Sequence, residues 1–222
     1  MTPKTIVFDL DGTLADTAAD LVAALNVTLA SEGLDAVPVE AARNLIGAGA
    51  RVLIRRGFAL EGRALDDMTL ETLFTNFLAY YNANIAVHSK LYPGVVECLD
   101  DLSADGWRLA VCTNKLERST RLLLEALGVA DRFAFLCGQD TFGVGKPDPK
   151  PLLKTIAKVG GAPERTVMVG DSLTDIKTAR AAATKVVAVD FGYADAPIAA
   201  LGPDRVISHF DALKEAAASL LA

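Results

Sequence analysis

Short apolar runs rich in β-branched residues alternate with longer stretches of helical periodicity along most of this sequence. Such alternation is typical of a parallel β-sheet, because each parallel connection has to cross back to the start of the next strand, usually as a helix. It predicts an α/β fold with a doubly wound, Rossmann-like parallel sheet as its core. We expect strands at residues 5–8, 108–112, 135–136, 166–169, 185–189 and 205–207, and helices at residues 94–104, 116–127, 149–159, 173–183 and 211–221.

The alternation stops between residues 16 and 88. Apolar residues recur there at helical spacing, as at Leu21, Leu25 and Leu29, and no clear strand pattern is present. Three or four amphipathic helices are expected. The predicted organisation is an α/β core made of residues 1–15 and 89–222, with a small all-helical cap domain, residues 16–88, inserted after the first strand.

Composition limits the class of partner. The 222 residues are 51% hydrophobic and carry a formal net charge of −6, which favours a folded chain and argues against nucleic acid as the main partner. No apolar run is long enough to cross a bilayer, and the first residues do not resemble a signal peptide. We therefore expect a cytoplasmic protein without a membrane partner. The three cysteines and two histidines show no zinc-site spacing.

Two carboxylates follow the first predicted strand. Asp9 and Asp11 are two residues apart, so in extended chain their side chains point the same way, at the strand end where parallel sheets bind ligands. The repulsion between them calls for a hard divalent cation. Taken alone, the same letters also occur in turns and calcium loops.

Other strand ends carry polar residues too. Thr113 and Asn114 precede a helix and could bind an anion, or simply cap that helix. Asp171 and Asp175 flank another helix start, where acids are also favourable for the helix dipole. Lys146 lies in a proline-bounded loop that could hold it in place, although a single lysine is most often a solvated surface charge.

This order of acid, hydroxyl, lysine and acid, each at a separate strand end, resembles the haloacid dehalogenase superfamily over essentially the whole chain. The helical insert stands where members with a C1 cap have that cap. The matching segments are Phe8–Leu14, Thr113–Asn114, Lys146–Pro149 and Gly170–Asp175.

Within that superfamily, the chain is most similar to the bacterial phosphoglycolate phosphatases. Two positions depart from their pattern: Ala48 replaces a residue that is often polar, and Ala183 stands where glycine is common. The segments that carry the similarity are Asp11–Thr17, Asp20–Leu21, Ile46–Ala50, Val189–Tyr193 and Pro203–Ile207.

The resemblance implies hydrolysis of a phosphate monoester, most specifically 2-phosphoglycolate, with Mg²⁺ as cofactor. It implies that Asp9 attacks phosphorus to form an aspartyl-phosphate and that Asp11 first protonates the leaving oxygen and then activates water. Mg²⁺ would be held by Asp9, the backbone carbonyl of Asp11, and Asp171.

The resemblance also implies roles for the remaining residues. Thr113, Asn114 and Lys146 would bind phosphoryl oxygens, and Asp175 would orient Lys146 or metal-bound water. In the cap, Gly47 and Gly49 suggest a tight bend near the substrate, or a plain turn between helices. Arg51, Arg55 and Arg56 could bind a substrate carboxylate or form a solvated helix face, and Arg56 is the candidate we name.

Other functions stay open at this point. Another small-molecule phosphatase of the superfamily or a sugar phosphomutase would use the same core residues, and a phospho-accepting signalling domain also needs a strand-end aspartate and Mg²⁺. A dehalogenase is less favoured, because a halide leaves without a proton and would not need Asp11. The expected partner is a small phosphorylated metabolite, and the expected assembly is a monomer or homodimer.

Overall fold

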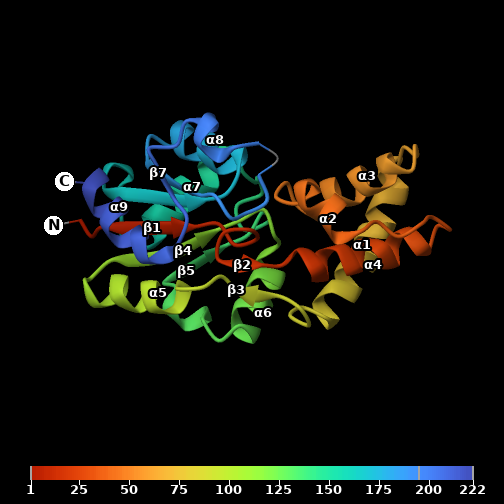
Figure 1. Cartoon of the computed structure of the whole chain (residues 1–222), viewed down its shortest axis with the longest axis horizontal. Coiled ribbons are helices and arrows are strands. Elements are labelled where there is room, and N and C mark those ends of the chain that lie inside the picture. The colour runs from red at the N-terminus through yellow and green to blue at the C-terminus, as the bar shows by residue number, and fades with distance from the viewer. Residues whose placement is uncertain (1, 195, 222) are drawn as a thin grey trace.

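The computed structural model describes residues 2–194 and 196–221. Its main sheet has the strand order β5-β4-β1-β6-β7-β8, and every neighbouring pair is parallel, which confirms the predicted α/β core (Figure 1). The expected strands are found to within one residue at each end. Their bounds are β1 Thr5–Phe8, β4 Arg108–Cys112, β5 Phe135–Cys137, β6 Thr166–Gly170, β7 Lys185–Val189 and β8 Arg205–Ile207.

Helices cover both faces of this sheet. Ile6 and Phe8 of β1 pack into one apolar cluster with α5, α6 and α9, whereas Val7 packs into a second cluster with α7 and α8. This division follows from the alternation of side chains along a strand, and it leaves β1 buried at the centre. The helix bounds are α5 Val95–Ala104, α6 Glu117–Ala126, α7 Pro149–Lys158, α8 Leu173–Ala181 and α9 Leu213–Leu220.

The segment after the first strand forms a separate group of helices, seen at the right of Figure 1. These helices bury their own apolar cluster, which includes Leu25, Phe58 and Phe77. The expected cap boundaries stay a prediction, and residues 1, 195 and 222 of the expected core lie outside the described residues. The helices are α1 Ala18–Ala30, α2 Val39–Ala42, α3 Ala50–Leu60 and α4 Asp67–Ala83.

Two short strands that the sequence pattern did not reveal join the helical group to the sheet. β2, Ala15–Asp16, pairs antiparallel with β3, Lys90–Leu91. Asp16 therefore belongs to a strand, although only helices were expected from that residue onwards. A two-residue strand is too short to show alternation, so no sequence pattern marks it.

Among the described residues, no helix combines the length and apolar character that crossing a membrane requires.

Candidate active site

The predicted site residues gather at the carboxyl ends of the central strands. Asp9 follows β1, Thr113 follows β4 and Asp171 follows β6. β1 pairs with β4 on one side and β6 on the other, so that these three strand ends are direct neighbours. This is the edge at which open parallel sheets bind ligands, and here it faces the helical group (Figure 1).

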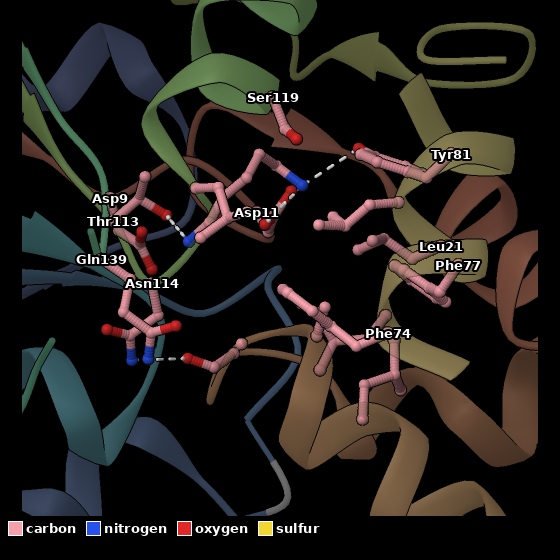
Figure 2. Close-up of a pocket in the computed structure, with 18 residues that line it drawn as sticks. Asp9, Asp11, Leu21, Phe74, Phe77, Tyr81, Thr113, Asn114, Ser119 and Gln139 are labelled. Atoms are coloured by element: carbon pink, nitrogen blue, oxygen red, sulfur yellow. Dashed lines mark hydrogen bonds and ion pairs between the residues drawn. The ribbon is translucent and has the colours of Figure 1, made fainter. Parts of the chain in front are cut away.

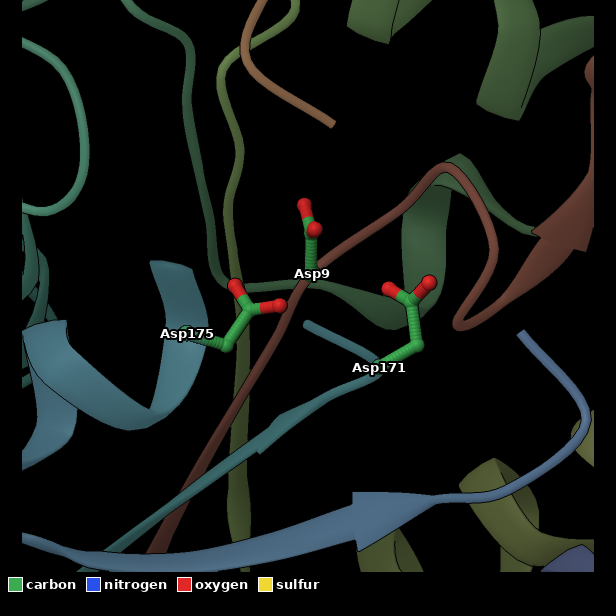
Figure 3. Close-up of side chains that lie close together, drawn as sticks. All are labelled: Asp9, Asp171 and Asp175. Carbon is green, nitrogen blue, oxygen red and sulfur yellow. The ribbon is translucent and has the colours of Figure 1, made fainter. Parts of the chain in front are cut away.

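Three buried carboxylates meet at this edge. Asp9, Asp171 and Asp175 each offer an oxygen, and these oxygens all lie within 4.8 Å of one another (Figure 3). Lys146 places its ammonium 2.9 Å from Oδ1 of Asp9 and 2.6 Å from Oδ1 of Asp175. One lysine against three carboxylates leaves an excess of negative charge in a buried region.

The protonation of these acids reflects that excess. Burial raises the pKa of Asp9 to about 6, although the nearby Lys146 opposes the shift. Burial, together with the charges of Asp175 and Asp9, raises the pKa of Asp171 to about 8. Oδ1 of Asp9 is fully buried and has no hydrogen bond of acceptable geometry among the described residues, despite the nearby ammonium. A hard divalent cation with oxygen ligands would satisfy that atom and offset the charge, so the donor set fits Mg²⁺.

Neighbouring residues fix Asp171. Its Oδ1 accepts a hydrogen bond of 2.9 Å from the Thr13 hydroxyl, and its Oδ2 accepts one of 2.7 Å from the Tyr193 backbone N–H. A side chain at Gly12 or Gly192 would overlap the Asp171 carboxyl group, so both glycines are needed for the close approach of these loops.

Asp175 has two structural roles. With Ser172 it forms a capping box at the start of α8, and its other oxygen accepts from Lys146. The Asp175 side chain therefore caps α8, the alternative considered from the sequence, and also contacts Lys146. Because Asp175 accepts from Ser172 and from Lys146 at 2.6 Å, it is well suited to holding the lysine in position.

Asp11 lines the same pocket but contacts other groups. Its Oδ1 accepts a hydrogen bond of 2.7 Å from Thr17, and its Oδ2 lies 3.1 Å from the ammonium of Lys115. The carboxylate of Asp11 is outside the acidic group described above, so any metal contact would have to use its backbone carbonyl, as the family resemblance implies.

Asn114 connects three segments of the site. Its Oδ1 accepts from the backbone N–H of Lys146 at 2.8 Å, and its Nδ2 donates to the backbone carbonyls of Lys146 at 3.1 Å and Gly47 at 3.2 Å. The side chain therefore holds the lysine loop and reaches the helical group. Thr113 is buried beside it and lines the pocket.

The pocket lies between the sheet edge and the helices (Figure 2). Gly47 and Gly49 line it, with φ angles of +106° and +90°, in the loop that leads into α3. A Cβ at Gly49 would lie 3.2 Å from the backbone oxygen of Asn114 and 3.2 Å from the side chain of Gln139, so the loop sits directly on the core. The apolar wall of the helical group is formed by Leu21, Leu53, Phe74, Phe77 and Tyr81.

The cap arginines do not reach this pocket. Arg56 is not among its lining residues, and its guanidinium donates to the backbone oxygen of Leu45. Arg51 forms a bidentate ion pair with Glu71, and Arg55 binds the Leu65 carbonyl and Asp67. The structure therefore supports the solvated-face alternative for these helix residues, including Arg56. Sequence spacing alone could not place Arg56 relative to the pocket, because it does not show which face of α3 meets the core.

Sequence reasoning missed several residues that contact the predicted ones. Lys115 follows Thr113 and Asn114 directly, so its place in a strand-end loop was a usable signal. Tyr81 is a buried cap residue whose helical spacing indicated only a core position. The hydroxyl of Tyr193 accepts from the backbone N–H groups of Thr17 and Ala18 at the start of α1, a contact across the chain that no local pattern reveals.

Comparison with known proteins identifies the family of this chain. The sequence model of the haloacid dehalogenase-like hydrolases matches residues 6–189. The chain belongs to this family. It is 49% identical to the phosphoglycolate phosphatase of Mesorhizobium japonicum, over 96% of this chain and 94% of that protein. It is 48% identical to that of Agrobacterium fabrum, over 95% and 90% of the two chains.

A solved structure shows the same arrangement. A predicted phosphoglycolate phosphatase from Haemophilus somnus superposes with a TM-score of 0.89 at 33% identity, covering 97% of this chain and 98% of that one. This similarity covers both the sheet core and the inserted helices, including the segments that line the pocket between them.

Proposed function

We propose that this haloacid dehalogenase-like hydrolase is a Mg²⁺-dependent phosphoglycolate phosphatase, which converts 2-phosphoglycolate and water to glycolate and phosphate. The relatives named phosphoglycolate phosphatase, at up to 49% identity over nearly the full chain, support the substrate. The observation that carries the chemistry is Oδ1 of Asp9, a buried carboxylate oxygen at the strand edge that lies 2.9 Å from the Lys146 ammonium and has no well-formed hydrogen bond to any described residue.

In the first step, an oxygen of Asp9 attacks phosphorus, and the bond from phosphorus to the ester oxygen breaks. Asp11 gives its proton to that oxygen, so that glycolate leaves as an alcohol. In the second step, Asp11 takes a proton from water, the water oxygen attacks phosphorus, and the aspartyl-phosphate bond breaks. Phosphate leaves and the Asp9 carboxylate is restored.

The surrounding residues are proposed to hold the phosphoryl group. Thr113, the backbone N–H of Asn114 and the ammonium of Lys146 would bind its oxygens, and Asp175 would keep Lys146 in position. Mg²⁺, held by Asp9, Asp171 and the backbone carbonyl of Asp11, would supply the positive charge that lets a carboxylate approach a phosphate.

Residues 16–88 are proposed to act as a cap that selects the substrate. Thr113, Asn114 and Lys146 would bind the phosphoryl group, whereas the wall opposite the sheet edge comes from the helical group. The carbonyl of Gly47 already contacts Asn114, which shows how closely the two parts approach.

Phosphate release from a panel of small phosphate esters with Mg²⁺ tests the proposal. We expect 2-phosphoglycolate to give the highest kcat/KM, without any added bisphosphate activator. A clear preference for another ester, or a requirement for a bisphosphate, would contradict the assignment and favour a sister phosphatase or a mutase.

Asp9→Asn tests the nucleophile. The amide keeps the shape but cannot attack phosphorus, so we expect less than a few per cent of wild-type activity, a barrier increase above roughly 2 kcal/mol. Asp190→Asn is a matched control, because Asp190 is an exposed acid after β7 that does not line the pocket. Circular dichroism should show both variants folded. Substantial activity in folded Asp9→Asn would exclude Asp9 as the nucleophile.

A further inference from the structure

One buried cation in the pocket has no part in the proposed mechanism. Lys115 lies between β4 and α6, and its side chain is only 5% exposed. A lysine that deep is uncommon unless its charge is matched by a partner. Here it faces the pocket, beside the proposed proton donor Asp11 and opposite the helical group.

Two groups contact the Lys115 ammonium. It donates to the Tyr81 hydroxyl at 3.0 Å and lies 3.1 Å from Oδ2 of Asp11 (Figure 2). It also lies 4.5 Å from the centre of the Tyr81 ring. An ammonium has three N–H donors, and no third polar partner for the Lys115 ammonium is found in the described part of the chain. One donor therefore remains for a ligand in the pocket.

The Asp11 carboxylate, 3.1 Å from the ammonium, offsets the charge of the buried Lys115. Lys115 is also the one basic residue that lines the pocket among residues 2–194 and 196–221. The opposite wall is apolar apart from the Tyr81 hydroxyl, and the cap arginines are engaged elsewhere.

We propose that Lys115, oriented by Tyr81 of α4, binds the carboxylate of the substrate and thereby selects phosphate esters that carry an anionic group close to the ester oxygen. This inference rests on the proposed function, and it names the residue that distinguishes 2-phosphoglycolate from phosphate esters without a carboxylate. Lys115 is then a specificity residue, and Tyr81 is a positioning residue that acts through it.

The short distance between Lys115 and Asp11 sets the length of the substrate. For proton transfer, the ester oxygen has to lie within about 2.7 Å of an Asp11 oxygen. Because the ammonium is only 3.1 Å from Oδ2 of Asp11, an anion bound to it lies close to the same ester oxygen. A carboxylate separated from that oxygen by one carbon, as in 2-phosphoglycolate, suits this spacing better than one separated by two.

The experiment compares three esters of similar size: 2-phosphoglycolate, its neutral amide 2-phosphoglycolamide, and the longer acid 3-phosphooxypropionate. For the wild type, we expect kcat/KM to be highest for 2-phosphoglycolate. In Lys115→Met, the ratio of kcat/KM for 2-phosphoglycolate to kcat/KM for the amide should fall by about 10- to 100-fold, as expected for loss of a hydrogen bond to a charged group. The preference for the shorter acid should fall as well.

Two further variants complete the test. Tyr81→Phe keeps the ring that stacks on Phe77 but loses the hydroxyl, so the preference should fall by a smaller factor. Lys158→Met removes an exposed lysine of α7 and should leave the preference unchanged. Thermal unfolding shows which variants are folded. If Lys115→Met does not fold, Tyr81→Phe decides.

The outcomes separate the two proposals. If the wild type shows no preference for 2-phosphoglycolate, the proposed function fails. If the wild type prefers 2-phosphoglycolate and folded Lys115→Met keeps that preference, the specificity inference is overturned. It is also overturned if Lys115→Met loses activity equally on the acid and the amide, because Lys115 then acts only through Asp11. An unchanged preference in Tyr81→Phe likewise overturns the role of Tyr81.

Discussion

Asp9 and Asp11 are two residues apart, yet they contact different lysines. Asp9 is fully buried beside Lys146, whereas Asp11 is bound by Thr17 and Lys115. Pairs of carboxylates in different surroundings are able to take different roles in one reaction. The difference in partners supports the division proposed above, with Asp9 as nucleophile and Asp11 as acid and base.

Asp11→Asn should lower turnover of 2-phosphoglycolate by roughly 10²- to 10⁴-fold, because the amide cannot protonate the leaving oxygen. Acetyl phosphate needs little help from an acid, so its first step should survive, and phosphorylated Asp9 should accumulate. Intact-protein mass spectrometry measures this adduct, with Asp190→Asn as control. Absence of the adduct in the folded variant would contradict the role given to Asp11.

At the scale of single elements, the turns matter most. Ala183, in the turn between α8 and β7, has a φ of +54° and is the one non-glycine residue with positive φ among those described. The family resemblance of the sequence already indicated that glycine is common at this position. Gly49 also has a positive φ, of +90°, but it lies against the core, so a side chain there meets other atoms.

Ala183→Gly should stabilise the protein. The left-handed conformation costs an alanine about 1–2 kcal/mol, and the extra entropy that glycine has in the unfolded chain offsets about half of that gain. We expect a rise of roughly 0.5–1 kcal/mol in the free energy of unfolding, measured by urea titration. Ala182→Gly, at a buried neighbour with negative φ, should instead destabilise. A loss of stability in Ala183→Gly would contradict the inference that the backbone of Ala183 is strained.

Gly49→Val should sharply lower kcat/KM for 2-phosphoglycolate and affect acetyl phosphate much less. The new side chain would meet Asn114 and Gln139 and keep the cap loop from the core, where closure excludes water and completes the site. Gly62→Val is the matched control, because Gly62 has a φ of +67° and open space around it. Equal losses on both esters would mean that the bend serves only the packing of the cap.

Across the whole molecule, the acids at the sheet edge link folding to pH. Without metal, the folded protein binds more protons than the unfolded chain, since burial raises the pKa of Asp9 from 3.8 to about 6 and that of Asp171 from 3.8 to about 8. The contribution of these groups to the free energy of unfolding therefore falls as pH rises from about 4 to about 8.

Mg²⁺ should raise the Tm more at pH 8 than at pH 5, because it binds the charged carboxylates and competes with protons for them. Thermal unfolding with and without Mg²⁺, with chelator as reference and at constant ionic strength, measures this difference. Asp171→Asn should reduce the Mg²⁺ effect at pH 8. An equal shift at both pH values would argue against metal binding by these acids, as would full phosphatase activity in excess chelator.

Local patterns in the sequence determined the strands, most helices and the loops that carry the chemistry. Strands such as Thr5–Phe8 are short, apolar and followed at once by acids, so period and position were sufficient to place Asp9 and Asp171 at one sheet edge. The family motifs then gave each of these residues an expected role, and those roles stay predictions to be tested.

Only the tertiary structure decided which side chains meet. The pairing of Lys115 with Tyr81 and Asp11, the exclusion of Arg56 from the pocket, and the Tyr193 contact at the start of α1 join segments far apart in the chain. Such contacts depend on how the helical group is oriented and packed against the sheet. Periodicity along one element does not encode this orientation, because the orientation is set by the fit between two packed surfaces.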